Sequence, residues 1–142
     1  MNKSILILLL AVFFVSCGNK TENKQAENPA QEQTVATADA SVVNVYYFHG
    51  KQRCKTCIAV GNLAQKTIED AYAGNNNVKF IEIDTSDKQN EALVEKYEIS
   101  WNALIIAKGN NSIDITERAF ATAVNSPEVL TGLIKEEVNN RL

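Results

Sequence analysis

Two cysteines separated by two residues lie between an apolar run and the start of a helical pattern. The run 42–48 is β-branched and aromatic, which is typical of a mostly buried strand. Cys54 and Cys57 follow a short loop, and from Cys57 onward apolar residues recur every three to four positions, which predicts a helix with one apolar face. The pair is therefore expected where a strand ends and a helix begins.

The spacing of the pair also bears on its purpose. A disulfide that serves mainly for stability gains most from closing a long loop. Cys54 and Cys57 have only two residues between them and close almost no loop. The sequence therefore favours a chemical role for these cysteines over a structural one.

The first 17 residues have the composition of an export signal. Lys3 precedes an apolar run over 5–15, which is about the length of a signal-peptide core and too short to span a bilayer as a helix. The run ends in Ser16 and Cys17, which resembles the lipobox of bacterial lipoproteins, where the cysteine is lipidated and becomes the first mature residue. An ordinary secretory signal that happens to end in a cysteine is the alternative interpretation.

The rest of the chain divides into a polar segment and a region of domain size. The segment 18–41 lacks aromatic residues and has few aliphatic ones, so we expect a disordered tether. Residues 42–142 are enough for one domain with a single core. The formal net charge is −3, and no basic stripe suggests nucleic-acid binding.

Within 42–142 the pattern predicts the order strand, helix, strand, helix, strand, strand, helix. Ser86 and Gln89 have the spacing of a capping box at the start of the second helix, and Ser126 with Pro127 marks the start of the last. The expected strands after the first cover 78–84, 103–107 and 113–117.

This order predicts an α/β fold. Two strand–helix–strand units imply parallel pairing with right-handed crossovers, and the last hairpin adds an antiparallel strand. We therefore expect a mixed four-stranded sheet with helices on both faces. The cysteines would lie at the carboxyl end of the first strand, which is the edge where sites are built in open α/β sheets.

The order of elements, with Cys-x-x-Cys at the start of the first helix, resembles the thioredoxin fold over nearly all of 42–142. More narrowly, the stretch FHGKQRCKTC is similar to small bacterial thioredoxin-like proteins in which an aromatic–His stretch precedes Arg-Cys-x-Thr-Cys. The resemblance implies a redox-active disulfide between Cys54 and Cys57.

Several features of the thioredoxin family are missing: Arg53 stands where it has Trp, Lys55 and Thr56 stand where it has Gly-Pro, and two further differences bear on the surroundings of the pair. Its cis-proline, which shapes the groove where the substrate backbone docks, has no counterpart in 100–104, where Trp101 and Asn102 are the candidates for that space. The buried acid of the family also has no match on the first strand, which offers Tyr46 and Tyr47 instead; we expect both tyrosines in the core.

The chemistry of the pair follows from its expected position. The start of a helix favours an anion, and we expect Lys51, Arg53 and Lys55 to add positive charge, so that the pKa of Cys54 lies below that of a free cysteine. Cys54 would then be the attacking thiolate and Cys57 the resolving thiol. The only histidine of the chain, His49, is a candidate proton donor or acceptor.

Other interpretations of the pair stay open. Cys54 and Cys57 could be an inert disulfide or two buried thiols. With His49 they could form a copper site, whereas structural zinc needs four ligands, more than these residues supply. The absence of the cis-proline favours a non-catalytic binding module or a metal carrier.

The sequence favours an exported, membrane-tethered thiol–disulfide oxidoreductase. It needs no organic cofactor, because its electrons reside on the sulfurs, and we expect a monomer without a metal. Its expected partners are protein thiols or disulfides, a redox protein that recycles the pair, and a membrane reached through lipid on Cys17. In a Gram-negative cell the domain would face the periplasm, and Gly18, which is not an inner-membrane retention acid, is compatible with the outer membrane.

Overall fold

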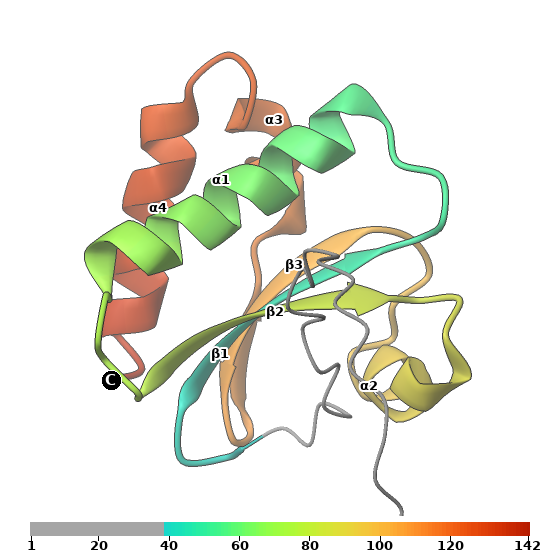
Figure 1. Ribbon diagram of the computed structural model, residues 1–142, viewed down its shortest axis with the longest axis horizontal. Helices are drawn as coiled ribbons and strands as arrows, with labels where there is room; N and C mark the ends of the chain where they lie inside the picture. The colour runs from blue at the N-terminus through green and yellow to red at the C-terminus, as the bar shows by residue number, and fades with distance from the viewer. Residues whose placement is uncertain (1–38) are drawn as a thin grey trace, which may run out of the picture. The chain divides into compact units, whose positions relative to one another are not determined.

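The computed structural model describes residues 39–142 (Figure 1). The predicted signal peptide with Cys17, and the predicted tether as far as residue 38, lie outside the described residues. Among the helices of the described part, none has both the length and the apolar character needed to cross a membrane.

A mixed four-stranded sheet forms the centre of the fold, in the spatial order β2-β1-β3-β4. β1 pairs in parallel with β2, and β3 pairs antiparallel with both β1 and β4. With the helices between them, the elements follow the thioredoxin-like order that the sequence predicts, and the α/β fold class is confirmed. The strands are β1 (Val43–His49), β2 (Val78–Asp84), β3 (Ala103–Lys108) and β4 (Asn111–Asp114).

The prediction of parallel pairing is wrong for the second strand–helix–strand unit. β3 begins beside the carboxyl end of β1, with Ala103 opposite Phe48. A parallel β3 would have to begin beside the amino end of β1, roughly 23 Å away for a strand of the length of β1. The connecting helix α2 (Glu91–Lys96) follows a short 3₁₀ turn, η1 (Lys88–Asn90), and its six residues span only about 9 Å.

The predicted fourth strand is also partly wrong, because β4 ends at Asp114 and a helix follows at once. The Asp114 carboxylate accepts a hydrogen bond from the Thr116 backbone N–H at 2.8 Å, and the Ala119 N–H bonds the Ile115 carbonyl at 2.9 Å. The Asp114 side chain therefore closes a short turn that leads the chain into α3 (Thr116–Thr122), which the alternation of apolar and polar residues did not predict.

The predicted capping box is wrong as well. Asp87 is the N-cap of η1, and its carboxylate accepts from the Gln89 N–H at 3.0 Å. The Ser86 hydroxyl instead donates to the Asp84 carboxylate at 2.6 Å. An ionised acceptor makes the stronger bond to a backbone N–H, so the aspartate takes the cap.

Helices cover both faces of the sheet, as predicted (Figure 1). Successive side chains of β1 point to opposite faces, so Tyr47 packs toward α1, α3 and α4, and Tyr46 packs toward α2. Both tyrosines are fully buried, which confirms their place in the core. The two long helices are α1 (Lys55–Ala71) and α4 (Pro127–Asn139), the latter beginning at the predicted proline.

Candidate functional site

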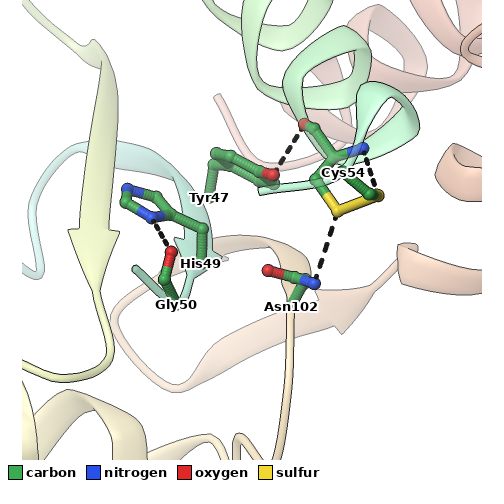
Figure 2. Close-up of a disulfide and its surroundings, with 6 residues drawn as sticks. Tyr47, His49, Gly50, Cys54 and Asn102 are labelled. Atoms are coloured by element: carbon green, nitrogen blue, oxygen red, sulfur yellow. Dashed lines mark hydrogen bonds between the residues drawn. A yellow bond between two sulfur atoms is a disulfide. The ribbon is translucent and has the colours of Figure 1, made fainter. Parts of the chain in front are cut away.

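Cys54 and Cys57 form a disulfide at the start of α1, directly beyond the carboxyl end of β1 (Figure 2). Their Cα atoms are 5.0 Å apart. Cys54 is exposed, whereas the Cys57 residue is 4% exposed. The first cysteine of the pair is thus a surface residue and the second is enclosed by the fold.

The backbone at the start of α1 contacts the exposed sulfur. Cys54 occupies the N-cap position, where a side chain usually accepts a hydrogen bond from the first turn. Its Sγ accepts from the Cys57 N–H at 3.1 Å. Because the first turn contains no acidic residue, nothing within it opposes a negative charge on this sulfur.

Tyr47 ties the strand to the cysteine helix. Its hydroxyl donates to the Cys57 carbonyl at 2.6 Å (Figure 2). Burial raises the pKa of Tyr47 while Arg53 acts in the opposite sense, so the phenol remains a donor at neutral pH. A Cβ at Gly61 would lie 2.6 Å from the tyrosine ring, so glycine is what allows α1 to approach this closely.

Arg53 is paired with a carboxylate that the sequence analysis did not name. Its Nη1 lies 2.6 Å from Glu82 Oε1, and its guanidinium lies 5.3 Å from the centre of the Tyr47 ring. Glu82 comes from β2 and is the register partner of Tyr47. The positive charge of Arg53 is therefore shared with Glu82, while Lys51 and Lys55 are exposed near the start of α1.

His49 belongs to the same group of side chains. Its Nε2 lies 3.2 Å from Glu82 Oε1, and its Nδ1 lies 2.9 Å from the Gly50 carbonyl (Figure 2). The side chain is only 13% exposed. Both ring nitrogens face acceptors, and among the hydrogen bonds of residues 39–142 none joins His49 to a cysteine.

The loop before β3 faces the disulfide. Asn102 Nδ2 lies 3.7 Å from Cys57 Sγ, and the buried Oδ1 of the same amide has no hydrogen-bond partner in the described part of the chain. The neighbouring Trp101 is 80% exposed. No peptide bond in the described residues is cis, so an asparagine with an ordinary trans backbone contacts the buried sulfur.

The described residues hold no group of three or more histidine, cysteine, aspartate or glutamate side chains placed to bind a metal ion. The copper site considered from the sequence would need His49 beside both sulfurs, and the ring is engaged with Glu82 and Gly50 instead. The geometry brings together Cys54, Cys57, Tyr47, Asn102 and the pair Arg53–Glu82.

Comparison with known proteins adds little. No family model matches the chain. No curated protein matches it either. Among solved structures, one described as "Structure of a malarial protein" is similar at 24% identity with a TM-score of 0.44, covering 68% of this chain and 98% of that chain. A TM-score of this size establishes neither a shared fold nor a shared function.

Proposed function

We propose that this protein is a thiol–disulfide oxidoreductase in which Cys54 attacks and Cys57 resolves. The observation that supports the proposal most directly is the asymmetry of the pair. Cys54 is an exposed residue at a helix N-cap whose sulfur accepts from a backbone N–H at 3.1 Å, and Cys57, one turn along, is buried. Only a thiolate attacks a disulfide sulfur, and a helix N-terminus stabilises that thiolate.

The reaction needs no group beyond the two sulfurs. In the reducing direction the Cys54 thiolate attacks a substrate disulfide, a bond forms between Cys54 and one substrate sulfur, and the other substrate sulfur leaves as a thiolate. The Cys57 thiolate then attacks Cys54 Sγ and displaces the second substrate thiolate. Two electrons pass from the dithiol to the substrate, the two cysteine protons pass to solvent or to the products, and the reverse sequence oxidises a substrate dithiol.

We further propose that the domain works outside the cytoplasm, held to a membrane by lipid on Cys17. The support comes from the sequence alone: an apolar run over 5–15 that ends in Ser16 and Cys17. Disulfide chemistry suits such a compartment, because it lacks the reducing systems of the cytosol. Metabolic labelling with a palmitate analogue in a bacterial host tests this part; labelling that persists in Cys17→Ser would contradict it.

The test of the reaction is a trap. Cys57→Ser leaves Cys54 able to attack and removes the group that resolves, so mixed disulfides with substrate proteins should accumulate and disappear on reduction. Cys54→Ser is the matched control and should trap nothing. Absence of trapped partners in Cys57→Ser, together with no reduction of a model disulfide by the wild type, would overturn the proposal.

The reduction potential separates this function from a structural disulfide. Structural disulfides typically have potentials below about −300 mV, whereas those of catalytic pairs are higher. Equilibration of the wild type with glutathione buffers should therefore give a mixture of reduced and oxidised protein within the accessible range. A pair that stays fully oxidised in those buffers would favour the inert alternative.

A further inference from the structure

The side-chain amide of Asn102 is the polar group that reaches the buried sulfur. Its Nδ2 lies 3.7 Å from Cys57 Sγ, within the range of a hydrogen bond to sulfur (Figure 2). Asn102 immediately precedes β3, and the first residue of that strand, Ala103, pairs with Phe48 near the end of β1. The pairing of β3 with β1 therefore holds the amide against the disulfide.

The two sulfurs have different donors. Cys54 is an exposed residue and its Sγ accepts from a backbone N–H of α1, so the helix and the nearby solvent both stabilise its thiolate. Cys57 is buried, and burial disfavours an ionised thiol. In the described part of the chain, the one side-chain hydrogen bond to Cys57 Sγ comes from Asn102.

The amide can serve both protonation states of Cys57. A thiolate accepts from the NH₂ group, whereas a thiol donates to the carbonyl oxygen after the amide turns about its last bond. That oxygen, Oδ1, is buried and has no partner among the described residues while the disulfide is intact. Asn102 therefore offers a donor and an otherwise unpaired acceptor to the same sulfur.

We propose that Asn102 is a catalytic residue of the resolving step, where its amide donates to the Cys57 thiolate. The inference rests on the proposed function. In that step the Cys57 thiolate attacks Cys54 Sγ of the mixed disulfide, the Cys54–Cys57 bond forms, and the bond from Cys54 to the substrate breaks. The electron pair leaves on the substrate sulfur, and the proton that Cys57 lost has gone to solvent.

The test is the reaction of the reduced full chain, in a Cys17→Ser background, with limiting dithionitrobenzoate, an aromatic disulfide whose thiolate product absorbs visible light. The first thiolate released reports attack by Cys54. The second thiolate reports resolution by Cys57. Stopped-flow absorbance measured across pH separates the two rates.

Asn102→Leu has nearly the same size but no amide. In this variant we expect the rate of the first thiolate release to equal that of the wild type. The rate of the second release, plotted against pH, should cross the wild-type profile. Loss of a hydrogen bond to a charged group should reduce the thiolate fraction at neutral pH by about tenfold. A more basic thiolate is about threefold more reactive. The second rate should then be about threefold slower near neutral pH and about threefold faster in alkali, where the thiol is fully ionised.

Asn102→Asp is the second variant, because it keeps the shape and places a negative charge beside the sulfur. It should slow the second release at neutral pH more than Asn102→Leu does. Ser100→Ala, an exposed position in the same loop, is the matched control and should leave both rates unchanged. All variants retain the titratable and charged groups of the site described above: Cys54, Tyr47, His49, Arg53 and Glu82.

The outcomes are distinct. If the second thiolate is released as fast in Asn102→Leu and Asn102→Asp as in the wild type at every pH, the inference is overturned and the proposed function stands. Equal slowing of both releases at every pH also overturns it, because that pattern indicates a structural role. A wild type that releases one thiolate per reagent molecule contradicts the proposed function, and the inference with it.

Discussion

Tyr46 and Tyr47 are neighbours on β1, fully buried, and turned to opposite faces of the sheet. The Tyr47 hydroxyl donates to the Cys57 carbonyl, whereas the Tyr46 hydroxyl is buried with no partner among the described residues. Tyr47 therefore links the strand to the disulfide helix on one face of the sheet, whereas Tyr46 serves for packing on the other. Similar burial does not imply a similar role, and the two faces should respond differently to the same substitution.

The largest expected effect is on the packing face in alkali. Burial, and then the nearby Tyr97, raise the pKa of Tyr46 to about 12 from an ordinary value of 10.0. Stability from the neutral phenol is complete below about pH 10 and is lost as the pH rises toward about 12, because the unfolded chain ionises first. Between about pH 9 and about pH 12 the wild type should lose on the order of 2 kcal/mol relative to Tyr46→Phe.

Urea unfolding of both proteins at several pH values measures this difference. The control is Tyr97→Phe, which keeps Tyr46 and should retain most of the alkaline loss, since burial is the larger cause. If wild type and Tyr46→Phe lose stability in parallel, the tyrosine is not the group that titrates.

The next effect concerns the close approach on the disulfide face. An added Cβ at Gly61 would lie 2.6 Å from the Tyr47 ring and 2.8 Å from Arg53 Nη2, so Gly61→Ala should destabilise the protein by about 1–2 kcal/mol despite the better helix propensity of alanine. Gly132→Ala in α4 meets open space and should stabilise by about 0.5–1 kcal/mol. Thermal unfolding should therefore give a lower melting temperature for Gly61→Ala and a higher one for Gly132→Ala. A melting temperature that also rises in Gly61→Ala would mean that α1 has room to move away from Tyr47.

Removal of the two hydroxyls tests the comparison directly. Tyr47→Phe should cost about 1 kcal/mol, because the bond to the Cys57 carbonyl is lost. Tyr46→Phe at neutral pH should leave the free energy of unfolding unchanged or raise it slightly, because it removes a buried hydroxyl that has no partner among the described residues. Equal costs for the two variants, measured by denaturant unfolding, would show that the faces do not differ in this respect.

The smallest effect is expected from the ion pair beside Tyr47. Glu82 accepts from Arg53 and faces His49, but its side chain is 41% exposed, so solvent screens the interaction. Glu82→Gln should cost about 0.5 kcal/mol at low ionic strength and less in high salt. Glu136→Gln, an exposed acid in the second half of α4 with no ion pair among the described residues, is the control. A loss in Glu82→Gln that does not depend on salt would point to packing instead of charge.

Much of the fold could be predicted from the sequence, because β1 is buried on both faces and its residues are apolar or aromatic almost without interruption. The position of Cys54 and Cys57 followed from the change of periodicity behind that strand. α3 was not predicted because Ile113 to Glu117 alternates as a strand would, whereas the Thr116 N–H bonds the Asp114 side chain in a turn just before the helix. The alternation alone does not reveal whether the chain continues as a strand after Asp114 or turns there.

The candidate site was less predictable where it depends on strand register. Glu82 lies beside Tyr47 because β1 and β2 pair in parallel with those two residues opposite each other, and no sequence pattern fixes that register. Arg53 was predicted as a source of positive charge, but its pairing with Glu82 depends on the same register. Asn102 falls where the thioredoxin family has its proline, but its contact with Cys57 depends on the antiparallel pairing of β3 with β1, which the sequence pattern did not predict.

The direction of β1 also determines which end of the domain carries the reactive pair. The chain enters this strand at Val43 and leaves it at His49, just before the cysteines, so the strand places its first residue roughly 20 Å from the end at which the disulfide lies. A partner that docks at the carboxyl end of β1 therefore need not contact the residues through which the chain enters the sheet.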